Sequence, residues 1–272
     1  MTADGRRGLA IIGGGKIGEA LLSGLVRRGG PDGLIVCERS PDRASQLADR
    51  YGVPALDLAD AAARARVLLV AVKPQDIDAL LTLLAEVVDE RHLVVSVAAG
   101  VPTARIEAAL PPGTPVVRVM PNTPALVDEG MAAISRGSHC DEAHLAEAES
   151  LLASTGKVIR VPERQQDAVT AISGSGPGYI FFVVESMIEA GVHLGLPRST
   201  ATELVVQTVI GSATLIRDTG EHPVVLRERV TSPGGTTAAA LRQLEEHKVR
   251  AAFLVAIEAA RDRSRALAEG LD

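Results

Sequence analysis

The sequence predicts an α/β fold: a doubly wound, mostly parallel sheet at the N-terminus, followed by an all-α C-terminal domain. Apolar runs of strand length alternate with helical segments from Leu9 to Val161. Strand patterns then stop, and only helical periodicity follows. A glycine-rich turn joins the first apolar run to the first helical segment. We therefore expect two domains, residues 1–162 and 163–272.

Composition limits the function classes. Of the 272 residues, 46% are hydrophobic but only 2% aromatic, which predicts a core of Ala, Leu and Val and argues against single-stranded nucleic-acid binding. The net charge of −6 provides no basic field for DNA or anionic lipid. Cys37 and Cys140 have no metal-ligand spacing, so we expect no metal site and a reducing compartment. Because no signal peptide or membrane-length apolar run is visible, we expect a soluble, cytoplasmic protein.

The first strand and the turn after it carry the clearest motif. Four apolar residues, 9–12, precede glycines at G-x-G-x-x-G spacing, and leucines at helical intervals follow. This context favours binding of a dinucleotide whose pyrophosphate lies on the helix N-terminus; an ordinary glycine-rich turn is the alternative. The predicted cofactor contacts here are Gly13, Gly14, Gly15, Lys16, Ile17 and Gly18.

A second apolar run, 33–37, ends at Glu38, Arg39 and Ser40. In such a unit, this position lies beside the adenosine ribose, where a carboxylate favours NAD and an arginine accommodates the 2′-phosphate of NADP. Arg39 and Ser40 are adjacent donors, so we expect NADPH, with NADH as the alternative. A purely structural interpretation is that these residues solvate the strand end and cap a helix beginning at Pro41.

Five further strands are predicted, and several of them end in short loops. The strands are Val67–Val72, Leu93–Val97, Val116–Met120, Gly130–Ile134 and Lys157–Val161. The loops at 73–74, 98–100 and 121–124 should share the carboxyl edge of the sheet, where ligands of this class bind. Each is also an ordinary turn sequence.

The second half reads as helices around two loops of small residues. The helices are Tyr179–Ala190, Arg198–Asp218, Pro223–Val230, Ala238–Glu246 and Val249–Ala268. The loops 173–178 and 231–237 are rich in Ser, Thr and Gly, which suits capture of a carboxylate, although plain helix capping explains either one alone. Extensive Ala-rich and β-branched faces predict pairing with a second copy of the chain.

Six segments give the chain a family likeness: Ile12–Gly18, Ala71–Pro74, Val95–Gly100, Arg118–Pro124, Ala171–Tyr179 and Val230–Thr237. With them the chain resembles pyrroline-5-carboxylate reductases. The resemblance implies an N-terminal Rossmann domain, a helical dimerisation domain and assembly of dimers into larger homo-oligomers. It also implies reduction of 1-pyrroline-5-carboxylate to L-proline by NAD(P)H, the last step of proline biosynthesis.

The resemblance assigns further site residues. Cofactor contacts would include Ala71, Val72, Lys73, Pro74, Ala98, Ala99, Gly100 and Asn122. Substrate contacts would be Glu163, Ser232, Gly235, Thr236 and Thr237. Two departures bear on cofactor preference: Glu38 stands where family members often have Asn, and Leu58 stands where some have an Asn.

The residue types suggest how such a reaction would proceed. A protonated cyclic imine accepts hydride readily, so no strong acid is needed, and neither small-residue loop holds His, Asp or Glu. We expect Thr237 to be the catalytic residue, with its hydroxyl hydrogen-bonded to the ring nitrogen. The N–H groups of Gly235 and Thr236 and the Ser232 hydroxyl would hold the carboxylate. The scattered histidines are expected to be surface or capping residues: His139, His144, His193, His222 and His247.

Two other function classes fit parts of the sequence. A β-hydroxyacid dehydrogenase would need a catalytic lysine on a helix of the second domain, but the only lysine after residue 157 is Lys248, just before the final helix. A non-catalytic dinucleotide-binding protein that senses redox state or scaffolds partners is disfavoured only by the intact Gly-Gly-Thr-Thr loop, 234–237.

Overall fold

The computed structural model describes residues 8–268. Contacts divide the chain into two compact units, 1–175 with 260–272, and 176–259. These units meet at 175/176 and 259/260, not at the predicted domain boundary of 162/163, which stays a prediction. None of the helices in the described part of the chain is long and apolar enough to span a membrane.

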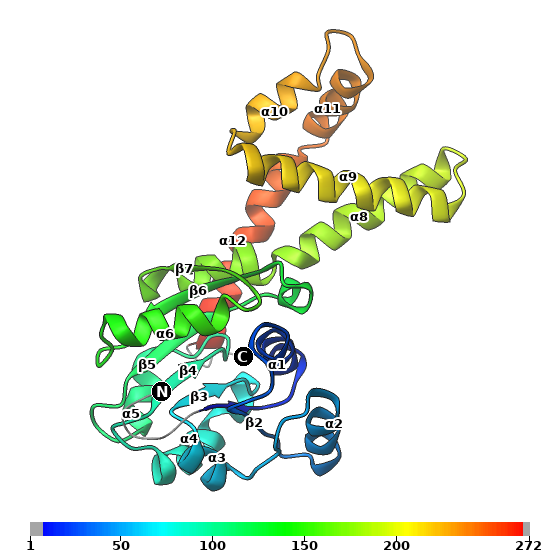
Figure 1. Ribbon diagram of the computed structural model, residues 1–272. Coiled ribbons are helices and arrows are strands. Elements are labelled where there is room, and N and C mark those ends of the chain that lie inside the picture. The colour runs from blue at the N-terminus through cyan, green and yellow to red at the C-terminus, as the bar shows by residue number, and fades with distance from the viewer. Residues whose placement is uncertain (1–7, 269–272) are drawn as a thin grey trace. The chain divides into compact units, whose positions relative to one another are not determined.

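The first unit is built on one seven-stranded sheet (Figure 1). Its strands are β1 Leu9–Ile12, β2 Leu34–Cys37, β3 Val67–Val70, β4 Leu93–Ser96, β5 Val116–Met120, β6 Gly130–Arg136 and β7 Gly156–Arg160. Their spatial order is β2-β1-β3-β4-β5-β6-β7. All neighbours pair in parallel except β5 and β6, which are antiparallel. This confirms the predicted fold class, and every predicted strand is present within a few residues of its expected bounds.

Helices cover both faces of the sheet (Figure 1). One buried cluster holds residues of α1 (Lys16–Gly29), α2 (Pro41–Tyr51) and α6 (Glu142–Leu152). The opposite cluster holds residues of α3 (Leu58–Arg64), α4 (Ile77–Val87) and α5 (Thr103–Ala109). The central strands are buried on both faces because parallel crossovers place a helix layer on each side.

Short helical turns complete this unit: η1 Pro74–Asp76, η2 Thr123–Val127, η3 Glu163–Gln165, α7 Gln166–Val169 and η4 Thr170–Gly174. The segment η4 is a π-helical turn. It leads through Ser175 into the next helix, so the predicted loop at 173–178 is wrong. Pro177 lies in the first helical turn, where backbone N–H groups have no intrahelical partner, and this removes the cost of a proline there.

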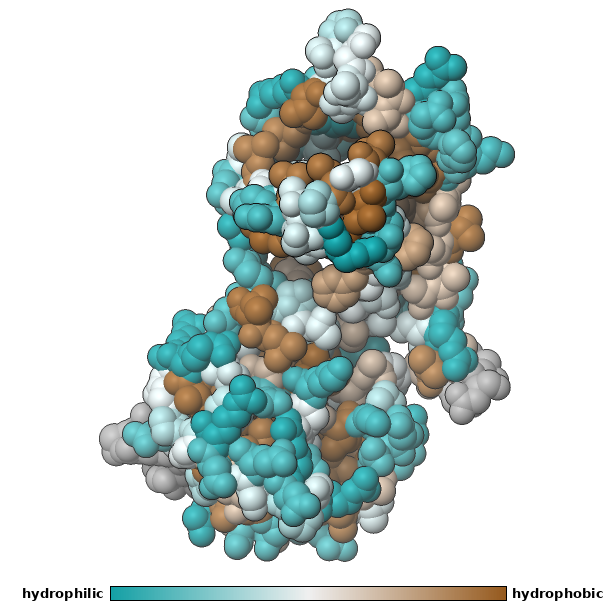
Figure 2. Space-filling model, turned by 90° about the vertical axis from the view of Figure 1, so that its right-hand side faces the viewer, coloured by the Kyte–Doolittle hydropathy of each residue, from teal (hydrophilic) through white to brown (hydrophobic). Residues whose placement is uncertain are grey.

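The second unit is helical: α8 Gly176–His193, α9 Arg198–Thr219, α10 Pro223–Arg229, α11 Thr236–Glu246 and most of α12 Val249–Ala268. Helices α8 and α9 lie side by side (Figure 1), and a Cβ built on Gly191 would come within 2.9 Å of Ala201 Cβ. Within 176–259, all of which is described, Ala201 and Val205 are the only buried hydrophobic residues. Large apolar side chains are instead exposed, and Figure 2 shows them gathered on the face in view.

Candidate functional site

Three glycines shape the turn from β1 into α1. Gly13 has φ +103°, and a Cβ there would lie 2.7 Å from the Ala71 carbonyl oxygen. A Cβ on Gly18 would overlap the carbonyl of Gly13, so helix and strand can pack this closely only with glycine. Gly15 is the N-cap of α1, exposed and with nothing within 4 Å of a built Cβ. This open, side-chain-free helix start fits the pyrophosphate of a dinucleotide.

Both polar groups of Gly14 are held by side chains. Its N–H donates to Glu38 Oε2 at 2.6 Å, and its carbonyl accepts from Arg43 Nε at 2.9 Å. The second oxygen of Glu38 accepts from the N–H of Ser40 at 3.1 Å. Glu38 therefore fixes the glycine turn, while the side chains of Arg39 and Ser40 are exposed beside it.

The carboxylate of Glu19 ties this turn to the second helix. It accepts from Arg43 Nη2 at 2.5 Å, from Arg50 Nη1 at 2.9 Å and from the Tyr51 hydroxyl at 3.0 Å. Burial alone would raise the pKa of Glu19, but the hydrogen bonds from Arg43 and Tyr51 and the charge of both arginines together lower it. Glu19 is thus held ionised at the centre of the α1–α2 contact.

The loops after β3 and β4 meet this turn at the same edge of the sheet, since the four strands β2, β1, β3 and β4 are adjacent and parallel. Ala71 and Val72 are half-buried, and Lys73 and Pro74 are exposed. In the turn 98–100, the outer residues are buried and Ala99 is exposed. Lys16 is exposed on the first turn of α1, and Ile17 packs against the core. The structure therefore brings together the predicted cofactor contacts from these three segments.

Asn122 uses its amide within the protein. Its Oδ1 accepts from the N–H of Met131 at 2.8 Å, and its Nδ2 donates to the carbonyl of Ser173 at 3.2 Å. The residue joins the end of β5 to the start of β6 and to the π-turn. Its expected contact with a cofactor stays a prediction.

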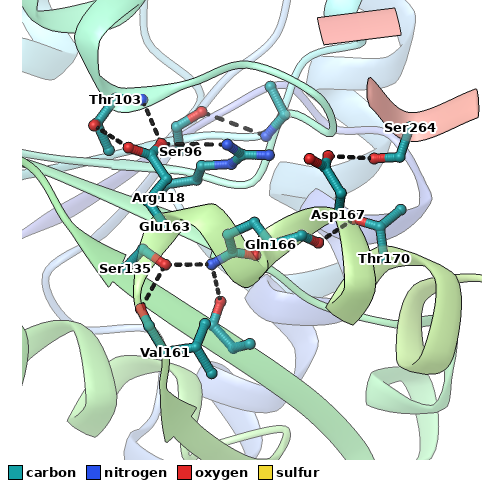
Figure 3. A network of polar contacts seen from close by, with 12 residues as sticks. Ser96, Thr103, Arg118, Ser135, Val161, Glu163, Gln166, Asp167, Thr170 and Ser264 are labelled. Carbon is teal, nitrogen blue, oxygen red and sulfur yellow. Dashed lines mark hydrogen bonds and ion pairs between the residues drawn. The ribbon is translucent and has the colours of Figure 1, made fainter. Parts of the chain in front are cut away.

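Glu163 lies in a network of polar contacts (Figure 3). Its carboxylate accepts from the N–H and the hydroxyl of Thr103, both at 2.7 Å, and from Arg118 Nη1 at 3.2 Å. The expected contact of Glu163 with a substrate is not tested by this geometry.

The remaining predicted substrate residues lie in the second unit. The N–H of Gly235 donates to the Ser232 carbonyl at 3.0 Å, which closes a turn in which Gly234 has φ +69°. Gly235 is the N-cap of α11, so the predicted loop ends there and Thr236 and Thr237 are the first helical residues. Thr236 is exposed and Thr237 half-buried. The arrangement presents N–H groups and hydroxyls at a helix N-terminus, which suits a carboxylate.

Three residues that organise the first unit were given no site role from the sequence: Arg43, Thr103 and Arg118. One signal was present, because Arg118 is a charged residue in the middle of an otherwise apolar strand. Its burial requires a partner. No short-range pattern identifies Glu163 as that partner, since the two are 45 positions apart.

The histidines largely serve structural roles. His144 completes a capping box with Asp141 at the start of α6, and His222 caps α10 through its ring. His92, which the sequence analysis did not consider, is buried, with Nε2 3.0 Å from the Ala62 carbonyl. These contacts give all three histidines a structural role.

Two family models match separate parts of the chain. Residues 163–267 match the family model for pyrroline-5-carboxylate reductase dimerisation, and residues 8–100 match the model described as NADP oxidoreductase coenzyme F420-dependent.

Whole-chain relatives extend the match. A pyrroline-5-carboxylate reductase of Corynebacterium melassecola is 46% identical, covering 95% of this chain and 98% of its own. The structure of a pyrroline-5-carboxylate reductase from Coxiella burnetii aligns with TM-score 0.90 at 37% identity, covering 96% of this chain and 98% of the other. The Plasmodium falciparum pyrroline carboxylate reductase, solved with NADP bound, aligns with TM-score 0.87 at 28% identity and the same coverages.

Proposed function

This chain belongs to the pyrroline-5-carboxylate reductase family, and we propose on that basis that it reduces 1-pyrroline-5-carboxylate to L-proline with hydride from NADPH. The observation that carries the proposal is 46% identity to a reductase of this name over nearly the full length of both chains. The reaction is the last step of proline biosynthesis, and we place it in the cytoplasm.

The glycine turn supports the dinucleotide. Gly13 and Gly18 leave no room for a side chain, whereas Gly15 leaves the helix start open, so a pyrophosphate can approach the backbone. We assign the remaining cofactor contacts to residues 38–40, 71–74, 98–100 and 122. When bound, the nicotinamide supplies the hydride.

Exposed donors favour NADPH over NADH. Arg39 is 90% exposed in its side chain and lies 3.9 Å from Asp76 Oδ1, a weak contact that leaves the guanidinium accessible. Both oxygens of Glu38 already accept backbone hydrogen bonds. Arg39 and Ser40 can therefore donate hydrogen bonds to the 2′-phosphate of NADPH. NADH has no 2′-phosphate and would not gain these charge-assisted contacts.

Residues of the second unit bind the substrate in this proposal. The N–H groups of Gly235 and Thr236 and the hydroxyl of Ser232 hold its carboxylate. The Thr237 hydroxyl donates a hydrogen bond to the ring nitrogen, which keeps the imine polarised while its carbon accepts hydride. The neutral ring nitrogen that accepts this hydrogen bond gains one proton overall, taken from solvent water, as the carbon gains hydride. Most of the rate enhancement comes from orientation of the imine.

The chain acts as a homodimer. In a single chain, the unit 176–259 exposes Phe181, Phe182, Leu204, Leu254 and Val255, an extent of apolar surface typical of a subunit interface. The match of residues 163–267 to a dimerisation model supports the same conclusion. Assembly of dimers into a larger homo-oligomer is part of the proposal.

The direct test is the loss of NADPH absorbance when 1-pyrroline-5-carboxylate is added to purified protein, with L-proline identified as the product. NADH in a parallel assay measures preference. Tight NADPH binding without turnover would instead favour a non-catalytic dinucleotide-binding protein.

A further inference from the structure

The start of α5 has an unusual cap. Pro102 occupies the N-cap position and makes no side-chain capping hydrogen bond. The carboxylate of Glu163, 60 positions further along, accepts instead from both the N–H and the hydroxyl of Thr103 at 2.7 Å (Figure 3). A carboxylate at this end of a helix satisfies a free N–H group and interacts favourably with the helix dipole.

Arg118 fixes the carboxylate from the other side. Its side chain is 8% exposed and donates from Nη1 to Glu163 Oε1 at 3.2 Å, and the side chain of Glu163 is 29% exposed. One carboxylate therefore accepts three hydrogen bonds and balances a buried cation (Figure 3). Removing its charge would leave Arg118 buried without its partner, which is costly.

The turn 98–100 lies shortly before this anchor in the chain. The turn leaves β4, where the N–H of Val97 donates to the Val70 carbonyl at 2.9 Å, and it re-enters regular structure at Thr103. Between these points Gly100 adopts φ +73°, and Val101 is buried. Since the segment is held at its two ends only a few residues apart, a shift of Thr103 must displace the turn.

We propose that Glu163 is a positioning residue for the dinucleotide: by holding Thr103 against Arg118, it sets the turn 98–100 at the cofactor edge of the sheet. Glu163 thus acts on NADPH through Thr103 and makes no contact with the imine. The inference rests on the proposed function for the identity of the cofactor.

The test compares Glu163→Gln with Glu149→Gln. Glu149 is a control in the same unit, since it also pairs with an arginine, Arg160, at 2.6 Å but lies on α6, outside the segments assigned to the cofactor. NADPH affinity is measured by fluorescence titration without substrate, followed by KM for each substrate. We expect Glu163→Gln to raise Kd and KM for NADPH roughly tenfold. This is the size of effect that the loss of one hydrogen bond to a charged group produces. KM for the imine should stay within about twofold, and Glu149→Gln should change none of these values.

The opposite pattern would overturn the inference. If Glu163→Gln raises KM for 1-pyrroline-5-carboxylate and leaves Kd for NADPH unchanged, Glu163 binds the substrate. The titration needs no turnover, so it reports on Glu163 even if the wild-type protein fails to oxidise NADPH, a result that would refute only the proposed reaction.

A milder variant covers the case in which Glu163→Gln does not fold. Thr103→Val removes the hydroxyl donor but keeps the N–H, and we expect a two- to fivefold rise in Kd for NADPH. In the double variant with Glu163→Gln, where that can be purified, the effects should be clearly less than additive, because both changes break one contact. An unchanged NADPH affinity in Thr103→Val would contradict the proposal.

Discussion

The N–H of Gly14 donates a hydrogen bond to Glu38 Oε2 at 2.6 Å. This contact joins the glycine turn after β1 to the end of β2, and Arg43 completes it by donating to the Gly14 carbonyl at 2.9 Å. The carboxylate that sequence reasoning placed at the ribose therefore serves first to hold the turn that receives the pyrophosphate. We therefore expect discrimination between NADPH and NADH to fall mainly to Arg39 and Ser40, which are exposed.

Arg39→Ala should weaken NADPH selectively. Its exposed guanidinium makes only a 3.9 Å contact with Asp76, so the substitution removes little native structure. We expect KM for NADPH to rise about tenfold or more, since a hydrogen bond to a charged group contributes about 1.5–3 kcal/mol. KM for NADH should change by less than about twofold. The absorbance assay with each cofactor measures the ratio, and an equal loss for both would show that Arg39 does not contact the 2′-phosphate.

The sheet was predictable because its signal is local. Strand β1 has the predicted bounds, since residues buried on both faces of a parallel sheet form an uninterrupted apolar run. Strand β5 also has the predicted bounds, although Arg118 interrupts its apolar run. The antiparallel direction of β6 was not predictable, because an apolar run has the same pattern in a parallel and in an antiparallel strand. The helices α3 and α5 were missed: each is seven residues long, and α5 is capped by Glu163, a contact with no local signature.

The site was predictable to a similar degree. Parallel neighbouring strands oblige their carboxyl ends to share an edge, so the glycine turn and the loops after β3 and β4 could be grouped from the sequence. The contacts that hold these segments could not be predicted from the sequence. Arg43 contacts Gly14 from 29 positions away, and Glu163 contacts Thr103 from 60 positions away. The segment 173–178 misled for a different reason, since Gly and Pro near a helix start resemble a loop.

The glycines of the turn should separate stability from binding. Gly18→Ala builds a Cβ into the Gly13 carbonyl, so we expect a loss of about 3 kcal/mol in the free energy of unfolding, at the upper end for overpacking. Gly15→Ala meets nothing within 4 Å and has ordinary φ and ψ, so stability should hardly change. It should still lower NADPH affinity, because the methyl group stands where the pyrophosphate approaches. Denaturant melts and NADPH titrations of both variants check this, and full NADPH affinity in Gly15→Ala would place the phosphates elsewhere.

Thr237→Ala tests the proposed catalytic contact. Thr237 is the second residue of α11 and half-buried, and its backbone should tolerate alanine. We expect kcat/KM for 1-pyrroline-5-carboxylate to fall by about 10²-fold, by analogy with removal of one oxyanion donor. Kd for NADPH should be unaffected, and Thr237→Ser, which keeps the hydroxyl, should recover most of the activity. Wild-type kcat/KM in the alanine variant would rule out this role.

The ionised Glu19 should make the α1–α2 contact sensitive to acid. Burial opposes ionisation, but Arg43, Tyr51 and Arg50 outweigh it, so the pKa of Glu19 in the folded chain lies below its ordinary value of 4.5. A lowered pKa contributes stability that is fully present above the unfolded value and is lost as the pH falls through the folded one. At pH 7, Glu19→Gln should therefore lower Tm by a few degrees, whereas the difference in Tm between wild type and variant should shrink steadily from pH 5 downward. Thermal melts of both proteins in a pH series measure this difference. A gap in Tm that stays constant between pH 7 and the acid limit of folding would mean that charge on Glu19 contributes nothing to the contact.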